Sequence, residues 1–209
     1  MPSKKKLIII LAILLVVDQV VKILVKTNMM IGESIHVFGD WFQILFIENE
    51  GAAFGFKLGG QWGKLILSIF RVGLIALVIY YIGHLRKKNA PKGVLIGFTM
   101  ILAGAIGNMI DSAFYGLIFS ESTYNTVATV FPEGGGYAPF MFGKVVDMLH
   151  FPIINSTWPS WMPWVGGQDF TFFSPIFNIA DSYITIAVIY LLIWHSKYFL
   201  RDEGKVKKE

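Results

Sequence analysis

The feature that most constrains this chain is a set of four apolar stretches, each long enough to cross a lipid bilayer. A transmembrane helix needs about 20 predominantly apolar residues, and such stretches run over about 7–25, 62–84, 93–117 and 175–194. Only 15% of the 209 residues are charged, whereas soluble domains contain about 25%. The sequence therefore predicts an all-α membrane protein with four transmembrane helices, organised as one membrane-embedded domain over 1–209.

Lysine and arginine residues gather at those ends of the four stretches that would lie on one side of the membrane. Basic residues precede the first stretch (4–6), fill the connection between the second and third (86–92) and follow the fourth (197–208). The positive-inside rule then predicts that both termini are cytoplasmic, which leaves 26–61 and 118–174 as outer segments. Because the basic residues mark membrane flanks, the net charge of +4 gives no support for nucleic-acid binding.

The absence of cysteine excludes disulfides, a thiol nucleophile and a thiolate metal site. The histidines are few and scattered, so no metal cage is expected. The first stretch begins like a secretory signal peptide, but Asp18, Gln19 and Lys22 interrupt it and no small-residue cleavage site follows. We therefore expect a retained membrane anchor.

Charged side chains lie inside the apolar stretches, where they are costly and therefore candidates for function. Asp18 and Lys22 are four residues apart and are predicted to pair on one helix face, in a structural or a functional role. Arg71 in the second stretch needs a partner, for which Asp18 or Asp111 could serve. At 1.5 Å per residue, Asp18, Asp111 and Asp181 all fall in the outer half of the bilayer.

The outer segments contain shorter patterns. Alternating residues at 35–38 and 41–47, separated by Gly39-Asp40, predict a small hairpin or meander at the membrane surface. A second β-like stretch over 143–151 contains Asp147. The last helix is expected to start near Ser174-Pro175, because serine is a good cap and proline suits the first turn. In the third stretch Gly93 and Gly97 permit close helix packing.

Two carboxylates in a poorly solvated place share one proton, which provides a base to activate water and an acid to protonate. Hydrolysis by a carboxylate pair is therefore the favoured hypothesis. One alternative is a small transporter in which Asp18, Asp111 and Asp181 bind cations along a path. Another is a scaffold that uses Trp158 to Trp164 as a docking patch.

Five motifs occur in the order found in one known family. They are Asp18-Gln19-Val20-Val21-Lys22, Asn49-Glu50-Gly51-Ala52-Ala53-Phe54-Gly55, Gly107-Asn108-Met109-Ile110-Asp111, Val145-Val146-Asp147 and Phe177-Asn178-Ile179-Ala180-Asp181. From about residue 10 to 195 the chain resembles the lipoprotein signal peptidases, or signal peptidase II, which are four-helix aspartyl peptidases of the bacterial inner membrane.

The resemblance implies that Asp147 and Asp181 are the catalytic pair. The residues that it implies for substrate binding or site ordering are Asp18, Asn49, Gly51, Asn108, Asp111 and Asn178. It also implies a β-cradle on the membrane surface and an active site near the outer face of the bacterial cytoplasmic membrane. The implied substrate is a prolipoprotein cleaved just before its diacylglyceryl-modified cysteine. We expect no cofactor, and a monomer that contacts membrane lipids and this substrate.

Two features depart from the family pattern. Arginine commonly follows the family's Gly-Asn-x-x-Asp motif, but this chain has Ser112 there, and Arg71 is a speculative substitute. The chain is also longer than usual between its motifs, with an insertion at about 118–143 and extra residues around Trp158 to Asp169. These departures affect the outer loops and leave the motifs intact.

Overall fold

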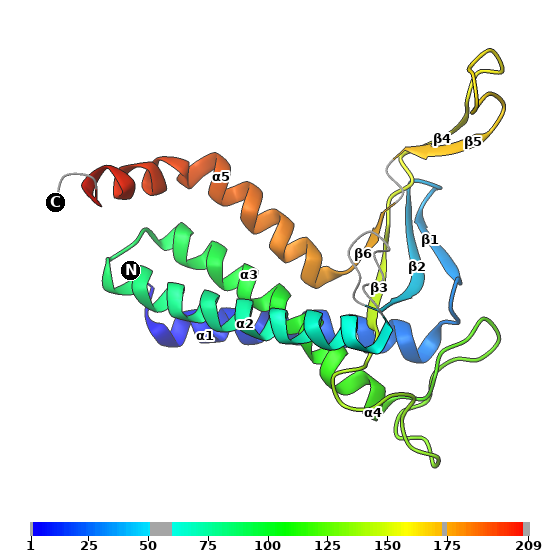
Figure 1. The fold of residues 1–209 in the computed structure, drawn as a ribbon, viewed down its shortest axis with the longest axis horizontal. Helices are drawn as coiled ribbons and strands as arrows, with labels where there is room; N and C mark the ends of the chain where they lie inside the picture. Colours follow the sequence, from blue (N-terminus) through cyan, green and yellow to red (C-terminus); the bar gives the residue numbers. More distant parts are fainter. Residues whose placement is uncertain (1, 51–59, 173–174, 207–209) are drawn as a thin grey trace.

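The computed structural model describes residues 2–50, 60–172 and 175–206. Within these residues, four helices are long and apolar enough to cross a membrane. They are α1 (Lys4–Asn28), α2 (Gly60–Lys87), α3 (Lys92–Ile110) and α5 (Ile179–Val206), and α3 continues through a π-helical turn, η2 (Asp111–Tyr115), into the short α4 (Gly116–Ile118) (Figure 1). The predicted fold class is confirmed, and the apolar residues exposed on α1, α2 and α5 give these helices lipid-compatible outer faces.

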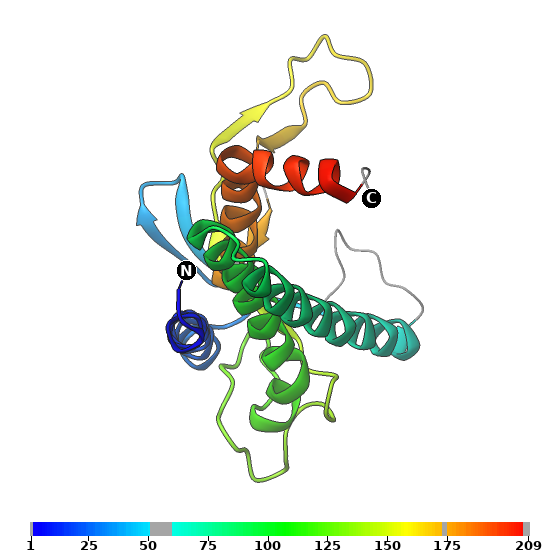
Figure 2. The same cartoon turned by 90° about the vertical axis from the view of Figure 1, so that its left-hand side faces the viewer.

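Helix α3 lies at the centre of the bundle and packs against α1, α2 and α5 (Figure 2). Its glycines allow α5 to approach closely, as the small-residue pattern predicts. A Cβ atom at Gly97 would come within 2.8 Å of the Leu191 side chain, and one at Gly104 within 2.3 Å of the Ala180 carbonyl oxygen. The start of α5, which contains Asp181, is therefore held directly against α3.

A four-stranded antiparallel sheet covers one end of the bundle, opposite the start of α1 and the end of α5 (Figure 1). Its strands are β1 (Ser34–Phe38), β2 (Phe42–Asn49), β3 (Val145–His150) and β6 (Ile176–Phe177), in the order β1-β2-β3-β6. The predicted hairpin is confirmed as β1 and β2. The sheet also brings Asn49 opposite Val145, and Asp147 opposite Ile47.

The start of the last helix differs from the sequence prediction. Residues Ile176 and Phe177 pair with His150 and Leu149 as a strand, and α5 begins at Ile179 instead of near Pro175. A proline followed by two apolar residues also suits an edge strand. The sequence alone does not distinguish these outcomes, because the pairing partner β3 is far away along the chain.

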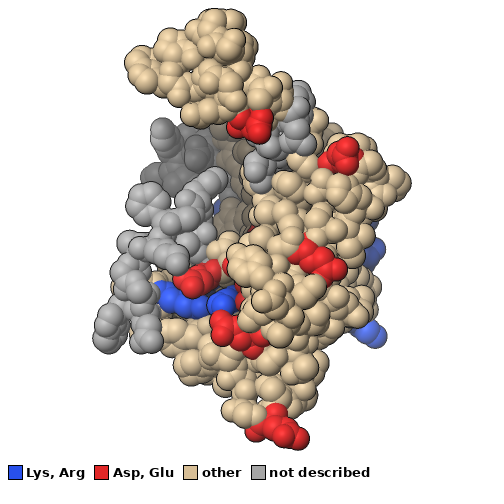
Figure 3. Space-filling view, turned by 90° about the vertical axis from the view of Figure 1, so that its right-hand side faces the viewer, with Lys and Arg blue, Asp and Glu red and all other residues tan. Residues whose placement is uncertain are grey.

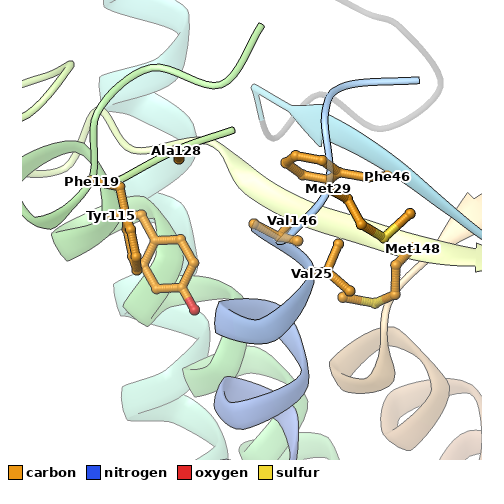
Figure 4. Close-up of a cluster of buried hydrophobic side chains, with 8 residues drawn as sticks. All are labelled: Val25, Met29, Phe46, Tyr115, Phe119, Ala128, Val146 and Met148. Carbon is orange, nitrogen blue, oxygen red and sulfur yellow. The ribbon is translucent and has the colours of Figure 1, made fainter. Parts of the chain in front are cut away.

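A buried apolar cluster attaches the sheet to the bundle. Its members come from the end of α1, from β2 and β3, and from the chain after α3, and they are Val25, Met29, Phe46, Tyr115, Phe119, Ala128, Val146 and Met148 (Figure 4). Val146 and Met148 flank Asp147 in β3, and both are fully buried. Because successive strand residues point to opposite faces, the burial of Val146 and Met148 turns Asp147 toward the other face.

The two regions of extra sequence form separate structures. Residues 119–143 pack beside the π-helical turn, with backbone hydrogen bonds from Gly143 to Ser112 and from Ala138 to Gly116. The extra residues around Trp158 to Asp169 lie in an arm built from β4 (Ile154–Thr157) and β5 (Asp169–Phe172), which projects away from the helix axes (Figure 1). Trp158 stacks on Phe170 in this arm, while Trp161 and Trp164 are exposed.

Candidate functional site

Two of the predicted site residues, Asn178 and Asp181, cap the start of α5. The Asn178 Oδ1 atom accepts a hydrogen bond from the Asp181 backbone N–H at 2.9 Å, and the Asp181 carboxylate accepts one from the Asn178 backbone N–H at 3.4 Å. This reciprocal arrangement is a capping box. The residues that cap the start of α5 are thus also the residues that orient its carboxylate.

Asp147 lies in β3 and faces these residues from the sheet. Its two carboxylate oxygens accept hydrogen bonds from Asn178 Nδ2 at 2.7 Å and from Asn49 Nδ2 at 3.2 Å. Its exposed fraction is only 4%. Burial, followed by the negative charge of Asp181, raises the pKa of Asp147 to about 7. A carboxylic acid with this pKa holds its proton for about half of the time at neutral pH.

Asparagine side chains connect the two carboxylates. Asn108 Nδ2 donates to Asp181 Oδ1 at 2.7 Å, and Asn108 Oδ1 accepts from Asn178 Nδ2 at 3.0 Å. Asn178 therefore donates to both Asp147 and Asn108. Residues from β3, α3 and the start of α5 form one continuous hydrogen-bonded network around the carboxylate pair.

A second group of charges lies directly behind Asn108. The Lys22 ammonium contacts Asp18 at 3.1 Å, Asp111 at 2.9 Å and Asn108 Oδ1 at 2.9 Å. The side chains of all three charged residues are at most 1% exposed. The predicted pair of Asp18 and Lys22 is confirmed. Arg71, for which Asp18 or Asp111 was the expected partner, donates a hydrogen bond to Ser112 Oγ at 3.1 Å.

Asp18 and Asp111 also bind backbone groups that fix the site. Asp18 Oδ1 accepts the Ala180 N–H at 3.0 Å, which attaches α1 to the first turn of α5. Asp111 Oδ2 accepts the Val146 N–H at 3.3 Å, which attaches the end of α3 to β3 next to Asp147. These two acids therefore support the elements that carry Asp147 and Asp181.

Gln19 and Tyr115 complete this support, and the sequence analysis gave neither of them a role. Gln19 Nε2 donates to Asp18, Asp111 and the Gly107 carbonyl, and Gln19 Oε1 accepts from the Tyr115 hydroxyl. Gln19 stands within the first motif, so its position beside Asp18 was an available signal. Tyr115 had no such signal, because its contact depends on the π-helical turn.

A further buried ion pair also lay outside the sequence prediction. Lys26, at the end of α1, contacts both Glu48 of β2 and Ser122 of the inserted segment. Lys144 reaches Glu48 at 3.5 Å and Glu121 at 3.1 Å. Basic and acidic side chains adjoin on the sheet end of the molecule (Figure 3). The inserted segment is therefore joined to β2 by the hydrogen bond from Ser122 to Glu48, and to the residue before β3 by the ion pair of Glu121 with Lys144.

The structure thus brings together most of the predicted site residues. Asp147, Asp181, Asn49, Asn108 and Asn178 form the network around the carboxylate pair, while Asp18 and Asp111 lie behind it. Gly51 lies outside the described residues. Across the described ranges, no group of three or more His, Asp or Glu side chains is arranged to hold a metal ion.

The fold and this network define a membrane-embedded protein with a carboxylate pair, of which Asp147 is buried and Asp181 half-buried, at one end of its helical bundle. A family model for signal peptidase II matches residues 10–197. The chain belongs to this family, and it is therefore a peptidase of the aspartic class.

Individual relatives and a solved structure agree with this membership. A lipoprotein signal peptidase of Porphyromonas gingivalis is 48% identical over 198 residues, covering 94% of this chain and 85% of the relative. One from Bacillus subtilis is 30% identical over 197 residues and covers 94% of both chains. A bacterial membrane enzyme solved by the in meso method superposes with a TM-score of 0.59 at 26% identity, covering 99% of this chain and 94% of the other.

Proposed function

We propose that the protein is an endopeptidase that removes the signal peptide from diacylglyceryl-modified prolipoproteins by cleaving before the lipidated cysteine. Its family membership and the relatives that are named lipoprotein signal peptidases support this substrate class. The observation that carries the proposal is the pair of Asp147 and Asp181, held by asparagines at a common site. Two such acids supply the base and the acid that peptide hydrolysis requires.

In this proposal Asp181 is the general base and Asp147 is the proton donor. Asp181 takes a proton from a water molecule as the water oxygen forms a bond to the scissile carbonyl carbon. Protonated Asp147 donates a hydrogen bond to the carbonyl oxygen, where negative charge develops. The carbon–nitrogen bond then breaks and the leaving amine takes a proton from the carboxyl pair. The raised pKa of Asp147 supports this division of roles.

The surrounding residues have ordering roles in the same proposal. Asn49 and Asn178 hold Asp147, Asn108 holds Asp181, and Asp18 and Asp111 support the elements that carry the pair. The acyl chains of the substrate lie against apolar helix faces, which delivers the peptide bond laterally to the sheet end. The sequence charge pattern supports a bacterial cytoplasmic membrane protein with both termini inside and the site at the outer face.

The test replaces each acid by its uncharged isostere. Purified Asp147→Asn and Asp181→Asn proteins are incubated with a diacylglyceryl-modified precursor, and mass spectrometry identifies the new N-terminal cysteine. We expect cleavage to fall by at least about a thousandfold in both, because neither variant can complete the proton transfers. Asp40→Asn is the matched control, since the Asp40 side chain is 88% exposed. Near-normal turnover by either folded site variant would overturn the assignment.

A further inference from the structure

An arginine of the second membrane span turns inward toward the carboxylate site. Arg71 lies eight residues after Gly63, where the apolar span of α2 begins, so it is about 12 Å along the helix axis. Its neighbours Phe70 and Val72 are exposed on the apolar surface of the bundle, while Arg71 is half-buried. An arginine at such a depth is energetically costly, and one that points toward the bundle interior is a candidate for a functional role.

Arg71 is one of three polar side chains that form a stripe along one face of α2. Lys64, Ser68 and Arg71 are spaced by four and three residues and therefore share one helix face. Lys64 Nζ donates to the Phe142 carbonyl at 2.7 Å, and Ser68 Oγ lies 3.5 Å from the Met141 carbonyl. These first two contacts attach α2 to the segment that leads into β3.

Arg71, the third residue of the stripe, is linked by hydrogen bonds to the residues that hold the carboxylate pair. Arg71 Nη1 donates to Ser112 Oγ at 3.1 Å, and the same hydroxyl donates to the Asn108 carbonyl at 3.1 Å. A hydroxyl has one proton to donate and lone pairs to accept, so the direction is fixed from Arg71 through Ser112 to Asn108. Asn108 then holds Asp181 through its side chain at 2.7 Å.

The charge of Arg71 also acts on the site. The carboxylates of Asp181, Asp111 and Asp147 all interact electrostatically with the Arg71 guanidinium. Lys22 contacts Asp18, Asp111 and the side-chain oxygen of Asn108. The two cations therefore approach the acidic cluster from different helices.

We propose that Arg71 is a positioning residue for the carboxylate pair, which it orders through Ser112 and Asn108 while its positive charge favours the ionised form of the pair. The proposal rests on the aspartic peptidase function proposed above. It also explains the serine at position 112, because the Ser112 hydroxyl is small enough to receive a guanidinium that arrives from α2. The cation and its acceptor are thus supplied by two different helices.

Variants of Arg71 and Ser112 test this relay against a purely structural role. We expect Arg71→Met to lower kcat by about tenfold or more with KM changed less than about threefold. The acidic limb of its kcat profile should move to higher pH, because the negatively charged pair loses a neighbouring cation. Arg71→Lys keeps the charge and should leave the limb in place, and Ser112→Ala should lower kcat without moving it.

The double variant Arg71→Met/Ser112→Arg returns a guanidinium to the same place from the other helix, and it should recover the acidic limb. Lys64→Met is the matched control. It removes a cation and a loop contact from the same stripe, so it should lower thermal stability but leave the pH profile unchanged. If Arg71→Met lowers thermal stability but leaves kcat and the acidic limb unchanged, the proposal is wrong. It is also wrong if Arg71→Lys shifts the acidic limb as far as Arg71→Met does.

An infrared titration of the carboxyl bands separates this proposal from the proposed peptidase function. It compares the wild-type and Arg71→Met proteins, with Asp147→Asn and Asp181→Asn used to assign the bands, and it needs no substrate. A shifted titration in Arg71→Met supports the relay even if the lipidated precursor is not cleaved. If the titration of Arg71→Met is unshifted while the wild-type protein cleaves the precursor, the relay is overturned and the proposed function stands.

Discussion

Asn178 and Asp181 cap helix α5 reciprocally, and Asn178 also donates a hydrogen bond to Asp147 at 2.7 Å. One buried side chain therefore has two tasks, since it caps the start of a membrane helix and orients a carboxylate on a strand of the sheet. The two tasks use different atoms of the side chain. Substitutions that remove one atom at a time can separate them.

Asn178→Ser keeps an oxygen that caps the helix but removes the amide that donates to Asp147 and Asn108. We expect a folded protein whose kcat falls by about tenfold or more, because the amide no longer orients Asp147, and whose stability falls by about 1–3 kcal/mol, because buried acceptors lose a partner. Asn178→Ala removes the cap as well, at an additional cost of about 1 kcal/mol. Ser3→Ala, which removes the cap of α1 at Lys6, is the control for cap loss far from the site. Equal activity of Asn178→Ser and wild type would contradict the orienting role.

The pH dependence of cleavage follows from the raised pKa of Asp147. The active form holds a proton on Asp147, so kcat should fall as pH rises through about 7 and that proton is lost. The hydrogen bond from Asn49 favours the ionised form of Asp147. Asn49→Ala should therefore raise the pKa of Asp147 and move the alkaline limb to higher pH. A full pH–rate profile checks this, with the exposed Asn125→Ala as the control, and a limb displaced downward would refute the assigned sign.

The buried charges around Lys22 make it essential for folding stability. Lys22→Met leaves Asp18 and Asp111 without their cation, and breaking such a buried pair costs about 3–5 kcal/mol. Thermal unfolding in detergent should show a large destabilisation, whereas Lys87→Met at an exposed position should be neutral. The triple variant Asp18→Asn/Lys22→Met/Asp111→Asn removes the unpaired charges and should recover most of the loss. No recovery would mean that packing, and not charge pairing, explains the effect of Lys22.

The contact between α3 and α5 depends on the missing side chain of Gly104. A Cβ atom there would lie 2.3 Å from the Ala180 carbonyl oxygen and 2.5 Å from Ile184 Cγ1. Gly104→Ala must therefore push α5 away from α3, at an overpacking cost of about 1–3 kcal/mol, and cleavage should fall because Asp181 moves with α5. Gly83→Ala has nothing within 4 Å of the added atom and should be neutral or stabilising by about 0.5–1 kcal/mol. Thermal unfolding and cleavage rates of the two variants check this contrast.

The sequence by itself determined the four membrane spans, the hairpin of β1 and β2, and the pairing of Asp18 with Lys22. These features depend on apolar length, on alternation and on helical spacing, which are local properties of the chain. The ordered motifs also indicated the family, which the comparisons confirmed. They identified Asp147 and Asp181 as a pair, an assignment that the proposed substitutions test.

Only the tertiary structure decided how the polar side chains share their partners. Residues 176–177 form a strand because β3 offers them a pairing edge, which places the start of α5 at Ile179. Tyr115 reaches Gln19, and Arg71 reaches Ser112, across 96 and 41 residues of sequence. A buried donor or acceptor must find a partner wherever the fold brings one, and no local pattern of residues encodes which distant group that is.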